Sequence, residues 1–247
     1  MLSEYAISLG DHSLILGQRL AEWCGHGPAL EVDIAMTNIA LDLMGQTRSY
    51  YQYAAQVEGK GRTEDDIAFL RDGNAFKNVL LVEQPNGDFA QTIVRQFFFD
   101  AWHDLFLEQL KLSKDDQLSA IAEKSIKEVN YHLRFSSEWV IRLGDGTEES
   151  QRRMQEAVNT LWMFTGELCS PSALETDMAQ QGFGVDLEII RPYYQEKLRT
   201  VLTEATLQIP ASTWDYKGGK DGRHTEHHGH ILAEMQWMQR AYPGMDW

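Results

Sequence analysis

The stretch that decides the fold is ALEVDIAMTNIALDLMGQTRSYYQYAAQV, residues 29–57. It has helical periodicity and contains no proline, and its apolar residues occupy almost every face of the helix. A helix of this length spans roughly 43 Å at 1.5 Å per residue, and the turn Gly59-Lys60-Gly61 ends it. A helix so long and so apolar indicates a buried member of a helical bundle. We expect its narrow polar seam to be buried too, at Asn38, Asp42 and Gln46.

Helical periodicity extends over nearly all the rest of the chain, and no alternating strand pattern competes with it. We therefore predict an all-α fold with one domain over residues 1–247, built as a long four-helix bundle with additional C-terminal helices. Asp88 is the expected N-cap of the third bundle helix. The bundle helices are expected at about 3–24, 29–57, 88–112 and 116–143. The outer helices are expected at about 150–168, 192–205 and 227–241.

Composition restricts the class of protein and its partners. The 247 residues carry a net charge of −15, and a surface of that sign repels phosphate backbones, so nucleic acid is not an expected partner. Two cysteines, Cys24 and Cys169, are too few for a disulfide scaffold. No apolar run is long enough to span a membrane, and no leader pattern opens the chain, so we expect a cytoplasmic protein.

Each of the four bundle helices places a histidine or an aspartate on its inward face: His12, Asp42, Asp100 and His132. This is the layout of a carboxylate-bridged di-iron bundle, in which two helices give one Glu each and two give Glu-x-x-His. The spacing agrees, because Asp42 follows His12 by 30 residues and His132 follows Asp100 by 32. A hairpin of two such helices needs about 30 residues between these positions.

The ligand set is nevertheless incomplete. His12 stands where a carboxylate belongs, Asp42-Leu43-Met44-Gly45 lacks the histidine of one motif, and Val129-Asn130-Tyr131-His132 lacks the glutamate of the other. Buried charges must be paired, so we interpret the degenerate positions as a buried polar network of His12, Asp42, Asp100 and His132. No catalytic, cofactor-binding or metal-binding residue is predicted in this chain.

Two alternative metal sites stay open at this level. One takes Asp100-Ala101-Trp102-His103 as an Asp-x-x-His motif with Glu128 opposite, although Glu22 on the first helix lies far from the level of Asp42. The other lies in the run His224-Thr225-Glu226-His227-His228-Gly229-His230, where His227 and His230, or His230 and Glu234, could share a metal. For this run the preferred interpretation is a hydrogen-bonded helix start, with Thr225 as the candidate cap but no capping box.

Several longer runs resemble the C subunits of the bacterial phenylacetyl-CoA epoxidases, a ferritin-like family, and the resemblance extends over essentially the whole chain. The runs are Leu20-Ala21-Glu22-Trp23-Cys24-Gly25-His26, Leu80-Leu81-Val82-Glu83-Gln84-Pro85-Asn86-Gly87, Tyr131-His132-Leu133-Arg134-Phe135-Ser136, His224-Thr225-Glu226-His227 and Leu232-Ala233-Glu234-Met235-Gln236.

The resemblance implies a structural subunit of a multicomponent monooxygenase in aerobic phenylacetate catabolism. The implied partner is a catalytic A subunit of similar fold, which holds the iron and epoxidises the ring of phenylacetyl-CoA, with electrons from an NADPH-dependent reductase subunit. This chain would then carry no cofactor, and it would bind the A subunit and the other subunits of the complex, with self-association left open. The alternative function is an independent di-iron or other metal-dependent ferritin-like oxidase.

Overall fold

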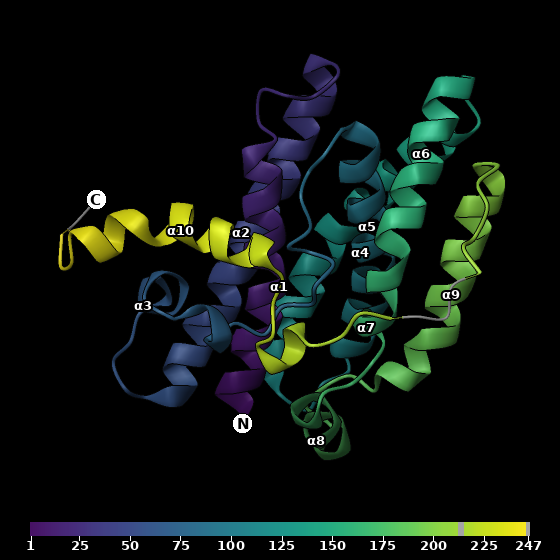
Figure 1. The fold of residues 1–247 in the computed structure, drawn as a ribbon. Helices are drawn as coiled ribbons and strands as arrows, with labels where there is room; N and C mark the ends of the chain where they lie inside the picture. The colour runs from purple at the N-terminus through teal and green to yellow at the C-terminus, as the bar shows by residue number, and fades with distance from the viewer. Residues whose placement is uncertain (212–214, 246–247) are drawn as a thin grey trace. The chain divides into compact units, whose positions relative to one another are not determined.

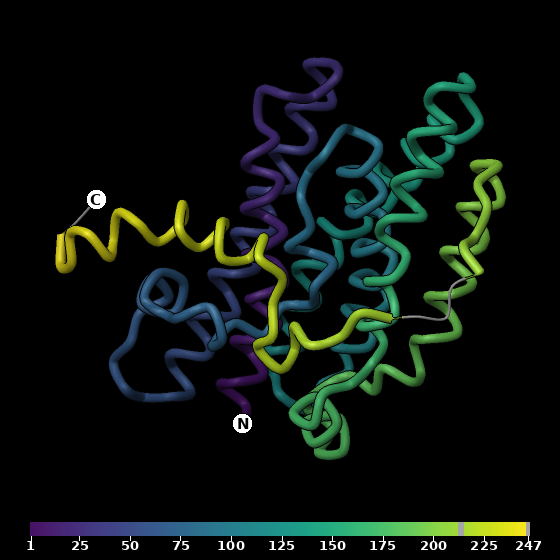
Figure 2. Tube along the Cα trace, in the orientation of Figure 1, coloured from purple at the N-terminus to yellow at the C-terminus, as the bar shows by residue number. Residues whose placement is uncertain are grey.

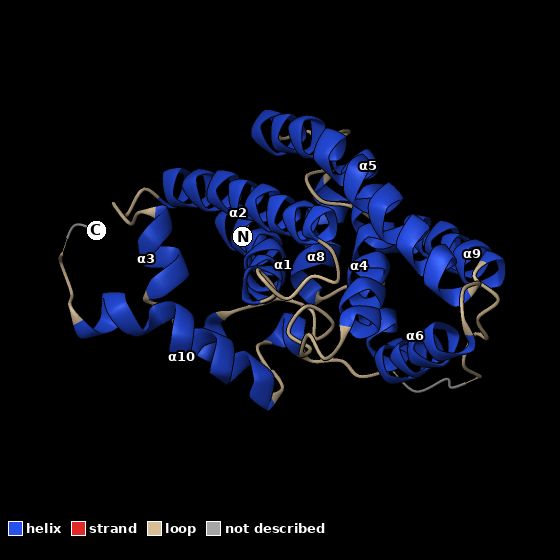
Figure 3. Ribbon diagram, turned by 90° about the horizontal axis from the view of Figure 1, so that it is seen from above, coloured by secondary structure: helices blue, strands red, loops and turns tan. Residues whose placement is uncertain are grey.

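The computed structural model describes residues 1–211 and 215–245. Its regular elements are helices, and no strand occurs among these residues (Figure 3). The predicted all-α class is confirmed, and two long helical hairpins are consistent with the ferritin-like class. No helix in this part of the chain is long and apolar enough to cross a membrane. The chain divides into two compact units, Met1–Gln84 with Gly218–Trp247, and Pro85–Lys217.

The first unit is built on the hairpin of α1 (Leu2–Glu22) and α2 (Leu30–Glu58), which run side by side in Figures 1 and 2. Two glycines of α1 allow this close approach. A Cβ at Gly10 would lie 2.5 Å from Tyr51 Cε1, and one at Gly17 would lie 2.6 Å from Met44 Cε. Gly59 ends α2 in the left-handed conformation, as the sequence predicts.

The expectation that α2 is buried all round is wrong for one face. Leu43 and Gln46 are buried, whereas Asp42 is half-buried and Asn38 is exposed. Three apolar side chains share the open face with Asn38, with exposed fractions of 71% at Leu30, 52% at Ile34 and 63% at Leu41. Helical periodicity does not distinguish a helix buried on all sides from one whose apolar face stays open to a partner.

Residues 59–84 make a long excursion in which the sequence predicted no helix. It contains α3 (Glu64–Phe69) and the 3₁₀ turn η1 (Gly73–Ala75). A capping box starts α3, with Thr63 and Asp66 as its two members. The first unit also includes a second 3₁₀ turn, η3 (Gly219–Asp221), and α10 (Glu226–Ala241). Gln236 of α10 donates to the backbone oxygens of Ala68 and Arg71, which fastens α10 to the end of α3.

The second unit is built on the hairpin of α4 (Phe89–Leu110) and α5 (Asp116–Gly144). Asp88 caps α4, as predicted, by accepting the Gln91 N–H. The outer helices are α6 (Glu148–Leu161), α8 (Ala173–Gln181) and α9 (Leu187–Glu204), with the 3₁₀ turn η2 (Trp162–Phe164) and the short α7 (Thr165–Leu168) between α6 and α8. The Tyr194 hydroxyl of α9 donates to the backbone oxygen of Phe98 on α4, at 3.1 Å.

Two outer helices differ from the prediction at one boundary, and one outer helix has no predicted counterpart. The helix expected at 150–168 ends as an α-helix at Leu161, where η2 interrupts it. The helix expected to start near Pro192 begins at Leu187, because Asp186 caps it and Pro192 is accommodated inside it. The helix α8 was missed, although Ser172 and Glu175 form a capping box at its start.

Candidate functional site

The predicted site residue Asp100 lies in the middle of α4, fully buried. Its two carboxylate oxygens accept separate hydrogen bonds, one from Gln96 Nε2 at 2.7 Å and one from Ser136 Oγ at 2.8 Å. His132 is also fully buried and lies one turn before Ser136 on α5. The structure therefore places Asp100 and His132 in one cluster of the second unit, together with an amide and a hydroxyl.

Burial controls the charge of this cluster. It raises the pKa of Asp100 from 3.8 to about 6, and the attraction of His132 with the two hydrogen bonds only partly opposes this. Burial also lowers the pKa of His103 to about 3, and the charge of His132 adds to that effect. Asp100 is thus a carboxylate that the fold makes costly to ionise, and His103 is neutral at physiological pH.

The other two predicted residues, His12 and Asp42, lie on the two helices of the first hairpin. His12 is buried, and its Nδ1 accepts the Val79 N–H at 3.3 Å. This hydrogen bond places the remaining ring proton on Nε2. Asp42 is half-buried on α2.

Two positions where the di-iron pattern requires a ligand supply no donor atom. Val129 is fully buried on α5, and its side chain is a hydrocarbon. Gly45 is exposed on α2, with no heavy atom within 4 Å of where a Cβ would lie. A di-iron centre needs a carboxylate or imidazole at both positions, so the residues present do not fit one.

The rival register of Asp100 and His103 also lacks a matching set. Glu22 is exposed and forms an ion pair with Arg19 at 2.9 Å. Glu128 is half-buried, and the ring of His103 packs among the aromatic rings of Phe99 and Trp102.

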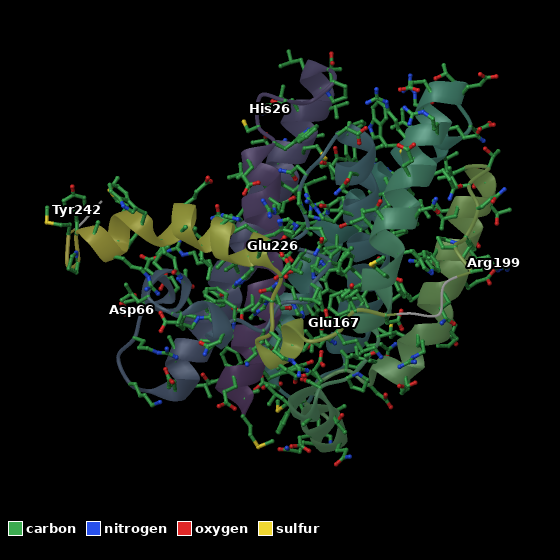
Figure 4. The ribbon with its side chains drawn as sticks, in the orientation of Figure 1. His26, Asp66, Glu167, Arg199, Glu226 and Tyr242 are labelled. Atoms are coloured by element: carbon green, nitrogen blue, oxygen red, sulfur yellow. The ribbon has the colours of Figure 1, made fainter. Side chains whose placement is uncertain are left out.

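The histidine-rich run divides between the surface and the interior. His230 and Glu234 are exposed and His227 is half-buried, whereas His228 is buried. Helix α10 starts at Glu226, labelled in Figure 4, with Thr225 as its N-cap. The Thr225 side chain makes no capping hydrogen bond. Its backbone N–H instead donates to Glu83 Oε1 at 2.7 Å, so a glutamate distant in sequence holds this helix start.

The side chain of His224 also lies inside the unit, with 7% of its surface exposed. Its Nδ1 lies 2.9 Å from Glu83 Oε2, and its Nε2 lies 3.0 Å from the backbone oxygen of Phe76. Burial opposes its charge, but the bond to Glu83 and the nearby oxygens raise its pKa above 6.5. The ring of His228 stacks on that of His224, 3.9 Å away and nearly parallel.

Glu83, His224 and His228 each bring a potential ligand atom within 4.8 Å of the other two. Hydrogen bonds already engage both oxygens of Glu83 and both nitrogens of His224. The two imidazole rings, moreover, are nearly parallel, so their in-plane lone pairs do not converge on a common point. Glu83 and His224 are thus arranged as a hydrogen-bonded pair.

A family model described as phenylacetic acid catabolic protein matches residues 1–247. The chain belongs to this family. It is 50% identical over 246 residues to the C subunit of 1,2-phenylacetyl-CoA epoxidase from Escherichia coli (strain K12), with 100% of this chain and 99% of the relative covered. The resemblance drawn from the sequence runs is confirmed.

The sequence predicted no role for Glu83. It belongs to the run Leu80–Gly87, and its partner His224 opens the run His224–His227, so two of the runs that carry the resemblance meet at one ion pair. A signal was available in the sequence. Glu83 directly follows the apolar run Val79–Val82, which must be buried, and a carboxylate at its end needs a partner.

Proposed function

We propose that this chain is the C subunit of a phenylacetyl-CoA epoxidase, a non-catalytic structural subunit in aerobic phenylacetate catabolism. It binds and stabilises a catalytic A subunit that holds the di-iron centre. The complex works in the cytoplasm with the remaining subunits and an NADPH-dependent reductase. The likeness to the E. coli relative along the whole chain supports this assignment.

The non-catalytic role rests on the chemistry of three positions in the di-iron pattern. Val129 and Gly45 have no donor atoms, and both oxygens of Asp100 already accept hydrogen bonds from Gln96 and Ser136. Each missing ligand leaves a coordination position to water or to nothing. The chain's own part in the reaction is therefore to support its partner.

The exposed apolar side chains of α2 support a docking role for that helix. Leu30, Ile34 and Leu41 lie on one face at helical spacing and are more than half exposed. Exposed apolar side chains grouped on one helix face are typical of protein interfaces, and permanent interfaces commonly bury roughly 2,000 Å² or more. We propose that this stripe contacts the catalytic partner.

Co-expression tests the assignment directly. The chain and a catalytic A subunit are expressed together and separately, and the products are compared by gel filtration, metal analysis and phenylacetyl-CoA turnover. We expect a stable complex, and a catalytic chain that is poorly soluble or inactive without its partner. A catalytic chain that turns over at full rate alone would remove the structural role. Stoichiometric iron in the isolated protein described here would favour the alternative, an independent metal-dependent oxidase.

A triple variant tests whether the stripe of Leu30, Ile34 and Leu41 on α2 contacts the partner. Leu30→Gln, Ile34→Gln and Leu41→Gln replace exposed apolar side chains with a good helix former, so the melting temperature should hold while the complex dissociates on gel filtration. The matched control is Ile189→Gln with Tyr193→Gln, because both side chains are exposed on α9. An intact complex in the triple variant, or equal loss in the control, would refute the assignment of the stripe.

A further inference from the structure

The ring of His224 lies between two hydrogen-bond acceptors. One nitrogen faces a carboxylate oxygen of Glu83 and the other faces the backbone oxygen of Phe76. A neutral imidazole carries one N–H and can donate only one of these bonds, whereas an imidazolium donates both. The geometry therefore calls for a doubly protonated ring.

The surroundings of Glu83 show which partner holds the proton. Its carboxylate also accepts the Thr225 N–H at 2.7 Å and Asn78 Nδ2 at 3.1 Å. A carboxyl group that accepts several hydrogen bonds is stabilised in its ionised form. Glu83 is fully buried and the His224 side chain is only 7% exposed, so the pair is an internal ion pair.

The packing around the stacked rings of His224 and His228 allows only one of the two to be charged. His228 stacks on His224, the ring of Phe76 meets His228 edge-on at 5.3 Å, and the Arg71 guanidinium covers Phe76 at 3.9 Å. Burial and the neighbouring charge of His224 lower the pKa of His228 to about 4. His228 is thus neutral when His224 is charged.

The charged side chains near His224 come from α1 and from residues 71–84. Glu83 and, from α1, Asp11 favour its positive form. The charge of Arg71, which follows α3, disfavours protonation of His228. The cluster joins residues 71–84 to the segment that leads into α10, since both His224 and the backbone of Thr225 bind Glu83.

We propose that the proton on His224 is a latch that holds residues 218–241, including α10, on residues 71–84, and that its loss at alkaline pH releases this segment while the α1–α2 hairpin stays folded. The pKa of His224 is raised in the folded chain. The stabilisation it provides is therefore complete below the ordinary histidine pKa of 6.5 and is lost as the pH rises through the raised value.

Two measurements on the full-length chain test the latch. Long-range ¹H–¹⁵N spectra of the histidine rings should show both nitrogens of His224 protonated at pH 7, with half-buried His227 as the internal reference. Hydrogen exchange, corrected for its intrinsic pH dependence, should show protection of residues 226–241 falling more than tenfold at alkaline pH. Protection of residues 30–58 should stay constant.

Variants test whether the charge on His224 controls the hydrogen exchange of α10. Glu83→Gln removes the counter-charge with little change of shape, so the pH at which α10 loses protection should fall by one unit or more, whereas the control His227→Gln should leave it unchanged. If Glu83→Gln does not fold, the ring spectra of the unaltered chain still decide. A singly protonated His224 at pH 7, protection that does not change with pH, or stoichiometric Zn²⁺ binding lost in His228→Ala would each overturn the proposal.

Discussion

Replacing Asp100 with asparagine should not destabilise the protein at neutral pH, although Asp100 is fully buried at the centre of a polar cluster. Asparagine keeps the shape of the side chain and an oxygen for Gln96 Nε2. Its amide group can donate to Ser136 Oγ, which can reverse its own hydrogen bond. The one feature that the substitution removes is the negative charge.

The magnitude follows from the pKa of Asp100. Because burial raises it from 3.8 to about 6, the folded protein keeps a proton that the unfolded chain has lost between these two values. The free energy of unfolding then falls as the pH rises through that window, by about 3 kcal/mol in total at 1.36 kcal/mol per pKa unit. Asp100→Asn removes this penalty, so its stability should equal or exceed that of the unaltered chain above pH 6.

Urea unfolding at pH 4.5, 6 and 7.5, followed by circular dichroism, measures the effect. The advantage of Asp100→Asn should grow with pH, while Glu123→Gln, at an exposed position of α5, should change nothing. Asp100→Ala should lose stability at all three pH values, because Gln96 and Ser136 then lack an acceptor at about 1–3 kcal/mol each. Equal destabilisation by Asp100→Asn and Asp100→Ala at pH 7.5 would show that the charge itself is required, contrary to this reasoning.

Gly144→Ala should cost about 1–3 kcal/mol in thermal unfolding, because the new Cβ would lie 2.3 Å from the Ala205 backbone oxygen. Gly45→Ala is its control and should gain up to about 1 kcal/mol, since its Cβ would meet nothing within 4 Å. Ser172→Ala breaks the capping box with Glu175 and should lower local stability in α8 by about 1 kcal/mol, seen as faster hydrogen exchange there. Unchanged exchange in α8 would argue against the cap.

The long helices could be predicted because their signals are local. The turn at Gly59 and the cap at Asp88 set two boundaries to within one or two residues. The helix starts that were missed are equally local, since Ser172 and Thr63 open capping boxes. The predicted start of α9 at residue 192 is too late, because Asp186 caps the helix and Pro192 lies within it.

The site could be predicted only in part, because its partners are distant in sequence. The inward positions of Asp100 and His132 follow from helical periodicity, but Gln96 and Ser136 emerge as partners only when α4 and α5 pack together. The pair of Glu83 and His224 joins residues 141 positions apart. No periodic signal marks such a contact, and only the rule that buried charges are paired points toward it.

The iron content of the complex with the catalytic partner decides whether this chain holds a metal centre of its own. Iron is counted per pair of one catalytic chain and one copy of this chain, with Asp42→Asn/Asp100→Asn as the comparison. The structural role predicts about two irons per pair, as one di-iron centre requires, and the same number in the double variant. About four irons per pair, falling to about two in the double variant, would contradict it.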